Sequence, residues 1–486
     1  MTLPPLNSLS IQAVANKLAT RELIITELLQ ACLQQIELRE PQVRAWTYLD
    51  IDHAKKQTAK LERVLRNISE RGNTSFSDPQ SPNSRGFESY PLLGIPVAVK
   101  DIFATLGMPT CWGTEIYQNR YLDHEAAVVS QLKSAGAIIL GKTVTTALAT
   151  ATAGSTTNPH NVAHTPGGSS SGSAAAVAAG MVPLAIGSQT MGSVLRPAAY
   201  CGVFGFKPSF GLISRYGMMP VSQVLDHVGV FARNLDDIQR LLSVLVKPDS
   251  RDPDCQFSEQ IVSFEQPLSE KLENGDRSIR LGLIKTPHWN HAEDVAQSRL
   301  LQAVDVLRQT NITVDLVSLP TEFARSWSII QKLCAYGLYQ NHGTLLTEYS
   351  GQCSPLLESW LKRGQAIAED TYQQACQERD RYRELLAPIF AQYDAVITPV
   401  TTGPAPLGLE NTGSPIFCGL WTLCGLPALN IPLGKTVDGL PLGCQLVGPL
   451  YGDQQLLETA HQCWDVLRDV FGEITLPQES LPEELE

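Results

Sequence analysis

The sequence lacks the spacings by which zinc sites and disulfide frameworks are usually recognised. Its 11 cysteines are scattered through 486 residues without a CxxC pair, and its nine histidines form no HExxH motif. Widely spread cysteines are typical of reduced, mostly buried thiols, whereas zinc sites need closely spaced ligands. The sequence therefore predicts no metal, no cofactor and a cytoplasmic location.

Long apolar runs and an excess of positive charge are missing as well. The first residues carry no charged segment followed by an apolar one, and no apolar run reaches the length that crosses a bilayer. The 37 Lys and Arg residues are outnumbered by 49 Asp and Glu, which gives a net charge of −12 without a basic stripe. Neither a membrane nor a nucleic acid is a predicted partner.

The composition is that of a globular enzyme, with 43% hydrophobic and 18% charged residues. Apolar residues at helical spacing predict helices over 1–70, and a polar stretch predicts a mobile loop at 71–90. Short β-branched runs alternate with alanine-rich helices over 91–235, and a polar stretch at 247–278 predicts a surface loop. Strand and helix patterns resume over 279–486. These alternations predict one α/β domain with a large central sheet.

Two short motifs suggest other enzymes but lie in the wrong surroundings. GAIILGKT at 136–143 fits a phosphate-binding loop, yet the residues between its glycines are Ala, Ile, Ile and Leu and predict a buried strand. GSSSG at 168–172 fits a nucleophile turn centred on Ser170, yet a loop precedes it instead of a strand. A Ser-His-Asp hydrolase stays open as an alternative. Its candidate bases are His160, His164 and His227, each of which suits an ordinary polar contact as well.

Three segments carry candidate catalytic groups. Lys100 ends the apolar run of GIPVAVKDIF, where burial would lower its pKa and make the amine a base, although strand-end lysines often reach solvent. GGSSSGSAAAVAAG at 167–180 runs into a short helix and predicts an ordered loop that carries hydroxyls. In GSQTMGS, Gly192 precedes Ser193 after a strand, which suits either an oxyanion-binding turn or a capping serine.

Taken together, these segments resemble the amidase signature family, whose members hydrolyse carboxylic amides through a Ser-Ser-Lys triad. The resemblance covers most of the chain. It runs from GIPVAVKDIF through HTPGGSSSGSAAAVAAG and GSQTMGSVLRPAAYCGVFGFKP to FCGLWTLCGLPALNIPLGKTVDGLPLGCQLVG. It implies the amidase signature fold, in which helices cover both faces of a large mixed sheet, and a single amidase domain over 1–486.

The resemblance also implies a role for each catalytic residue. Lys100 is expected to be the base, Ser169 the bridging serine and Ser193 the nucleophile that forms an acyl-enzyme. Protons would pass from Ser193 to Ser169 and on to Lys100, and water would release the carboxylate after ammonia or an amine has left. The peptide bond between Gly168 and Ser169 is expected to be cis. The oxyanion hole is expected to consist of the backbone N–H groups of Thr190, Met191, Gly192 and Ser193.

Three positions depart from the family pattern. Gln189 stands where many members have Asp, Met191 where many have Gly, and Ala147 where a branch of stand-alone amidases often has Glu. Gln189, with VLRP after the nucleophile, resembles that stand-alone branch, which predicts hydrolysis of a small or aryl-alkyl amide. The alternatives are the glutamine-hydrolysing subunit of a tRNA-dependent amidotransferase, a ureide or carbamoyl-type amide hydrolase, and a binding protein without activity.

The acyl pocket is expected to include the stretch 415–425. Its aromatic residues Phe417 and Trp421 suggest an apolar acyl group, but the same two side chains suit a hydrophobic core equally well. The predicted partner is therefore a small-molecule amide. A homodimer is a further hypothesis.

Overall fold

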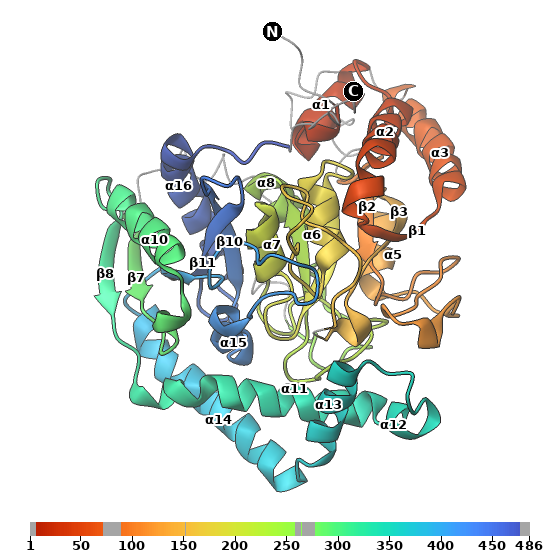
Figure 1. Cartoon of the computed structure of the whole chain (residues 1–486). Helices are drawn as coiled ribbons and strands as arrows, with labels where there is room; N and C mark the ends of the chain where they lie inside the picture. Colours follow the sequence, from red (N-terminus) through yellow and green to blue (C-terminus); the bar gives the residue numbers. More distant parts are fainter. Residues whose placement is uncertain (1–5, 71–88, 151, 258–263, 265–277, 477–486) are drawn as a thin grey trace, which may run out of the picture.

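A single mixed sheet of 11 strands organises the described part of the chain (Figure 1). The computed structural model describes residues 6–70, 89–150, 152–257, 264 and 278–476. The strand order is β1-β3-β2-β4-β6-β5-β10-β11-β9-β7-β8. The strands are β1 (Trp46–Leu49), β2 (Pro96–Lys100), β3 (Ile138–Thr143), β4 (Leu184–Gln189), β5 (Phe204–Lys207), β6 (His227–Ala232), β7 (Arg280–Ile284), β8 (Thr313–Val317), β9 (Ala395–Pro399), β10 (Ala428–Lys435) and β11 (Pro441–Val447).

Parallel strands lie in two groups, separated by antiparallel ones. β3, β2 and β4 run parallel, as do β9, β7 and β8, and every other neighbouring pair is antiparallel. β2, β3 and β4 are buried along their whole length, which explains their nearly continuous apolar sequences. The large mixed sheet predicted through the family resemblance is confirmed.

Helices cover both faces of this sheet, and the N-terminal helices lie at one end of it (Figure 1). The predicted helices of 1–70 are present, but a short strand, β1, interrupts them. The helices are η1 (Leu6–Ser8), α1 (Ile11–Thr20), α2 (Ile25–Val43), α3 (Ile51–Glu70), η2 (Glu115–Tyr117), α5 (Ala127–Ser134), η3 (Ala147–Ala149), α6 (Ser171–Ala178), α7 (Leu195–Cys201), α8 (Leu235–Leu245), η4 (Trp289–His291), α10 (Asp294–Leu307), η5 (Thr321–Arg325), α11 (Ser326–His342), α12 (Leu345–Glu348), α13 (Pro355–Gln365), α14 (Glu369–Phe390), α15 (Ile416–Leu423) and α16 (Asp453–Phe471).

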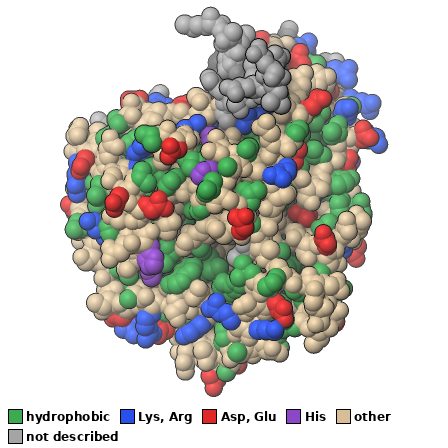
Figure 2. All heavy atoms as spheres, viewed as in Figure 1, with side chains coloured by type: hydrophobic (Ala, Val, Ile, Leu, Met, Phe, Trp, Pro, Cys, Tyr) green, Lys and Arg blue, Asp and Glu red, His purple; other side chains and the backbone are tan. Residues whose placement is uncertain are grey.

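A second helical layer lies beyond the sheet. α11 packs against both α13 and α14, and it also contacts α15, which links this layer to the centre of the molecule (Figure 1). On the face drawn in Figure 2, acidic and basic side chains lie interspersed. None of the helices in the described residues has the length and apolar character needed to cross a membrane.

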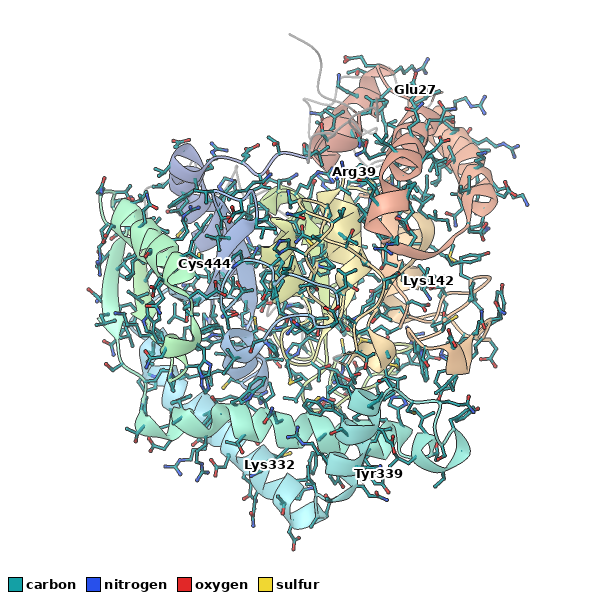
Figure 3. All side chains as sticks on the ribbon, in the orientation of Figure 1. Glu27, Arg39, Lys142, Lys332, Tyr339 and Cys444 are labelled. Carbon is teal, nitrogen blue, oxygen red and sulfur yellow. The ribbon has the colours of Figure 1, made fainter. Side chains whose placement is uncertain are left out.

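The segment that fits a phosphate-binding loop is a strand. Residues 138–143 form β3, and the side chain of Lys142, labelled in Figure 3, is completely buried. Its Nζ donates hydrogen bonds to the Thr110 hydroxyl at 2.7 Å and to the Phe103 carbonyl at 2.8 Å. A phosphate-binding lysine must reach a ligand, so this lysine is structural.

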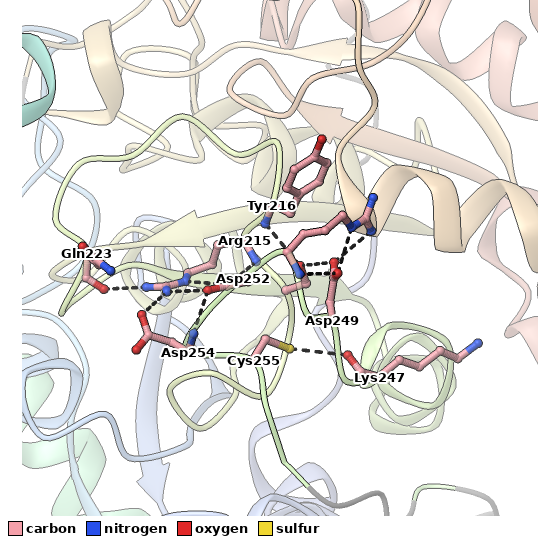
Figure 4. A network of polar contacts seen from close by, with 10 residues as sticks. Arg215, Tyr216, Gln223, Lys247, Asp249, Asp252, Asp254 and Cys255 are labelled. Carbon is pink, nitrogen blue, oxygen red and sulfur yellow. Dashed lines mark hydrogen bonds and ion pairs between the residues drawn. The ribbon is translucent and has the colours of Figure 1, made fainter.

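The described start of the 247–278 segment, predicted to be a surface loop, is tied to the core (Figure 4). Arg215 holds Asp252 through paired hydrogen bonds of 2.8 and 3.0 Å, and Ser214 donates to Asp249 at 2.7 Å. Asp252 and Cys255 are buried. Most of 258–277, and all but the end of the predicted loop at 71–90, lie outside the described residues. The division of 1–486 into regions of one domain stays a prediction.

Candidate active site

The site is built around a lysine at the end of a central strand. Lys100 is the last residue of β2, which lies between β3 and β4, and its side chain is completely buried. Its Nζ lies 2.7 Å from the Ser169 Oγ and 2.9 Å from the Ser188 Oγ. Ser169 belongs to the loop before α6, and Ser188 lies on β4. The structure thus brings together two of the three predicted triad residues and adds a second hydroxyl.

Burial strongly lowers the pKa of Lys100 from its ordinary value of 10.5. The largest cause is the loss of hydration on burial, which disfavours the charged ammonium form. The negative charge of Asp226 acts in the opposite direction and raises the pKa, whereas the positive charge of Arg196 lowers it. Within the described residues, the Lys100 Nζ lies within hydrogen-bond distance of two hydroxyls and of no carboxylate. The amine can therefore be neutral at pH values where an exposed lysine is charged.

The peptide bond between Gly168 and Ser169 is cis, as the family resemblance implies. The carbonyl of Gly168 accepts a hydrogen bond of 2.5 Å from the Arg196 guanidinium. The same guanidinium donates to the Gly413 carbonyl at 2.6 Å and to the Thr412 hydroxyl at 3.1 Å. Arg196 is buried and so links the loop of Ser169 to the loop that precedes α15.

Residues 190–193 lead from β4 toward α7 and end at Ser193, which is 8% exposed; they are here called the nucleophile loop after the role predicted for Ser193. Within the described residues, no hydrogen bond joins the Ser193 hydroxyl to Ser169, and the backbone N–H groups of Met191, Gly192 and Ser193 donate to no group. Gly192 has no room for a side chain, because an added Cβ would lie 2.7 Å from the Pro415 Cβ. The loop thus offers consecutive backbone donors next to a hydroxyl.

Gln189 and Thr422 hold this loop from behind. The Gln189 Oε1 accepts hydrogen bonds from the backbone N–H groups of Val194 at 2.8 Å and Leu195 at 3.0 Å. Its Nε2 donates to the Thr422 Oγ1 of α15 at 2.9 Å, and that hydroxyl lies 2.8 Å from the Met191 carbonyl. Met191 keeps a negative φ, so its side chain fits the loop without backbone strain.

Four residues of this arrangement were not predicted from the sequence: Ser188, Arg196, Asp226 and Thr422. Asp226 accepts hydrogen bonds from the Thr190 hydroxyl at 2.6 Å and from the backbone N–H groups of Val221 and Ser222. Ser188 offered a sequence signal, because it stands in GSQTMGS one residue before Gln189 on a strand that leads into the nucleophile loop. Asp226 and Thr422 lie 33 and 229 residues after Ser193, and no local pattern connects them to it.

Comparison with known proteins identifies the family. Residues 27–457 match the family described as Amidase. The chain belongs to this amidase family. It is 32% identical over 478 residues to a glutamyl-tRNA(Gln) amidotransferase subunit of Symbiobacterium thermophilum, a match that covers 90% of this chain and 93% of the relative.

Solved structures of family members share the fold. A peptide amidase from Stenotrophomonas maltophilia superposes with a TM-score of 0.79 at 27% identity, covering 98% of this chain and 99% of its own. A glutamyl-tRNA(Gln) amidotransferase subunit from Thermotoga maritima superposes with a TM-score of 0.78 at 26% identity, with the same coverage. The chain is thus an amidase-family enzyme, and its sheet and helices follow the fold of the family.

The serine and histidines of the alternative hydrolase are not assembled into a triad. Ser170 is buried, and its hydroxyl bonds to the backbone of Ser188, at 3.2 Å. Each histidine ring instead lies against a backbone carbonyl. These contacts are His160 with Cys201 at 2.9 Å, His164 with Ala405 at 2.8 Å and His227 with Leu225 at 2.6 Å. The geometry contradicts the Ser-His-Asp alternative. The described residues also contain no cluster of His, Cys, Asp or Glu that could hold a metal.

The two aromatic residues predicted for the acyl pocket are completely buried. Phe417 packs with Ala292 and Ile416, and Trp421 belongs to the main hydrophobic core. α15 faces the nucleophile loop through other positions, since Cys418 lies close to Gly192 and Thr422 bonds to Met191. This placement favours the core interpretation, and a role of the two aromatics in an acyl pocket stays a prediction. Ala147 lies in η3, with its N–H bonded to the Thr152 carbonyl, and nothing there explains its departure from the family.

Proposed function

We propose that the enzyme hydrolyses a carboxylic amide through an acyl-enzyme on Ser193, with Ser169 and Lys100 as the proton relay. The observation that carries the proposal is the completely buried Lys100 amine, which lies 2.7 Å from the Ser169 hydroxyl. A lysine buried in this way, with a strongly lowered pKa, can act as a base near neutral pH.

The hydrogen-bond geometry gives Ser188 a role in this relay. A neutral amine has two N–H groups and one lone pair. If one N–H is donated to Ser188 at 2.9 Å, the lone pair is free to accept the proton of Ser169 at 2.7 Å. Ser169 then takes the proton of Ser193 as Ser193 attacks the amide carbon. The same path in reverse protonates the leaving nitrogen, and water afterwards releases the carboxylate.

The negative charge of the tetrahedral intermediate is assigned to the nucleophile loop. The predicted donors are the backbone N–H groups of Thr190, Met191, Gly192 and Ser193, and the last three donate to no described group. Such fixed donors need no rearrangement when the charge develops, which is why they stabilise the transition state strongly.

Glutamine is the amide that the comparisons favour. The relatives from Symbiobacterium and Thermotoga share 32% and 26% identity and are amidotransferase subunits, matched over 93% or more of their length. We therefore rank the glutamine-hydrolysing component of a tRNA-dependent amidotransferase, working with partner proteins, before the stand-alone amidase that Gln189 suggests. The second candidate keeps one observation in its favour, namely the equally close fold of a peptide amidase at 27% identity.

Ammonia release tests both candidates in one experiment. Wild type, Ser193→Ala and the matched control Ser170→Ala are incubated with glutamine, a short aliphatic amide, an arylacetamide and a peptide amide. We expect release by wild type and Ser170→Ala but not by Ser193→Ala. Release from glutamine alone supports the amidotransferase component, and release from the other amides supports the stand-alone amidase. Equal release by Ser193→Ala and wild type would contradict the proposed nucleophile.

A further inference from the structure

The directions of two backbone N–H groups in the nucleophile loop are set by contacts on its far side. In a trans peptide unit, the carbonyl of one residue and the N–H of the next point in opposite directions. The Met191 carbonyl lies 2.8 Å from the Thr422 Oγ1, which fixes the direction of the Gly192 N–H. The Gly192 carbonyl accepts the N–H of Arg196 at 3.1 Å, which fixes the Ser193 N–H.

These two supports differ in origin. The bond to the Gly192 carbonyl comes from the backbone at the start of α7 and forms with any side chain. The bond to the Met191 carbonyl comes from the side chain of Thr422 on α15, and no other described donor reaches that carbonyl. The orientation of the Gly192 N–H therefore depends on which way one hydroxyl proton points.

Gln189 restricts that direction, because it donates to the Thr422 oxygen and cannot accept its proton. The Thr422 hydroxyl has one proton and two acceptors within reach, the Met191 carbonyl at 2.8 Å and the Cys418 carbonyl at 3.0 Å. Cys418 lies inside α15, where the backbone N–H four residues later is its regular donor. Because the Gln189 Nε2 donates to the Thr422 oxygen at 2.9 Å, the hydroxyl cannot donate to Gln189 and stays available for the Met191 carbonyl.

The orientation of the Gln189 amide is itself fixed. Its oxygen accepts two backbone N–H groups, of Val194 and Leu195, so its nitrogen must face α15. The side chain is completely buried. A carboxylate at this position could accept the same two N–H groups, but it could not donate to Thr422. The Thr422 hydroxyl would then turn toward the carboxylate and leave the Met191 carbonyl without a donor.

We propose that Gln189 is a positioning residue that acts through Thr422 to aim the Gly192 N–H at the oxyanion. The inference rests on the proposed function, since it concerns the transition state of attack by Ser193. Gln189 does not touch the substrate. It holds a donor in place, so its loss lowers the rate of the chemical step and leaves substrate binding unchanged.

Covalent labelling tests this without knowledge of the natural amide. An alkyl fluorophosphonate reacts when the Ser193 oxygen forms a bond to phosphorus, the P–F bond breaks, fluoride leaves and the Ser193 proton passes to Ser169. The phosphoryl oxygen that gains negative charge uses the same N–H groups. Mass spectrometry locates the adduct, and the labelling rate at several probe concentrations separates the maximal rate from probe binding.

Four variants define the expected result. Gln189→Met and Thr422→Val should lower the maximal rate by about 10- to 100-fold, less than complete loss of an oxyanion donor, with unchanged probe binding. The double variant should be no slower than the slower single one, because both changes remove the same hydrogen bond. Thr422→Ser keeps the hydroxyl and should label as the wild type does. The matched control is Gln445→Met, which removes a buried glutamine that holds the Pro399 and Phe417 carbonyls outside the loop.

Each outcome decides the inference. Labelling of Gln189→Met at the wild-type rate overturns it, as does an equal loss in Gln445→Met, because the effect would then be general destabilisation. If Gln189→Met does not fold, the difference between Thr422→Val and Thr422→Ser decides in its place. A wild type that is not labelled at Ser193 overturns the proposed function itself, and the inference with it.

Discussion

Two lysines are completely buried on neighbouring strands of the sheet, yet they lie in different surroundings. Lys100 ends β2 and Lys142 lies on β3, which pairs with β2 in parallel so that Val99 lies beside Lys142 and Lys100 beside Thr143. Lys100 meets two hydroxyls. Lys142 meets the Asp101 carboxylate at 3.3 Å, together with the Thr110 hydroxyl and the Phe103 carbonyl.

The comparison shows that burial alone does not make a lysine a base. Loss of hydration is the main cause of the lowered pKa at both sites, but opposite charge from Asp101 and a hydrogen bond to it hold the pKa of Lys142 at about 8. Lys142 therefore carries its proton at neutral pH and serves the fold. Lys100 has no hydrogen-bonded carboxylate among the described residues, and burial lowers its pKa well below 10.5. The hydrogen-bonding partners of the amine, more than the depth of burial of the side chain, decide which of the two lysines can accept a proton.

Replacing Lys100 is expected to have the largest effect on activity. Lys100→Met removes the proposed base but keeps the length of the side chain, and we expect amide hydrolysis to fall by about 10²–10⁴-fold, the usual contribution of a general base. Stability should be maintained or increased, because an apolar side chain replaces a buried amine. Hydrolysis rates and thermal unfolding measure both effects. A variant that keeps wild-type activity would remove Lys100 from the relay.

Replacing Lys142 is expected to lower stability and to leave activity nearly unchanged, the reverse of what we expect for Lys100. Lys142→Met leaves the Asp101 carboxylate buried without its cation, which is expected to lower the free energy of unfolding by about 3–5 kcal/mol. Activity per folded molecule should stay close to that of the wild type. Chemical denaturation measures the loss. The double variant Lys142→Met with Asp101→Asn removes the unpaired charge and should recover part of the stability, and its failure to do so would show that the ion pair is not the cause.

Local patterns in the sequence predicted those elements of the sheet and the site that are formed by residues close together in the chain. The strand ending at Lys100, the helix after Ser169 and the turn before Ser193 each follow from apolar runs, alanine-rich stretches and small residues close together in the chain. The apolar residues at 137–140, between two glycines, predicted a buried strand, and β3 begins within them but continues to Thr143. The short strand β1 was missed, because only four residues, Trp46–Leu49, separate two long helical patterns.

Contacts between distant segments could not be predicted in this way. Asp101 lies directly after Lys100 in the sequence, yet it pairs with Lys142, 41 residues later. The meeting of the Ser188 hydroxyl with Lys100 depends on the parallel pairing of β2 with β4, which neither strand specifies alone. Thr422 reaches the nucleophile loop only because α15 packs against it. Such pairs follow from the register and packing of the whole sheet, which residue spacing along the chain does not encode.

The pH dependence of the rate provides the finest distinction between the two lysines. In the proposed relay hydrolysis needs neutral Lys100, so kcat/KM should rise with pH up to the lowered pKa of Lys100 and level off above it. The hydrogen bond from Lys100 to the Ser188 hydroxyl stabilises the ammonium form more than the neutral amine. Ser188→Ala removes this bond and should therefore lower the pKa of Lys100 further. The rising limb should therefore move to lower pH, while kcat on the plateau falls about tenfold because the lone pair is no longer oriented toward Ser169. Thr110→Val, which removes the corresponding hydroxyl beside Lys142, is the matched control and should leave the limb in place. A limb that moves equally in both variants would mean that the profile reports a property of the whole fold and not the proton on Lys100.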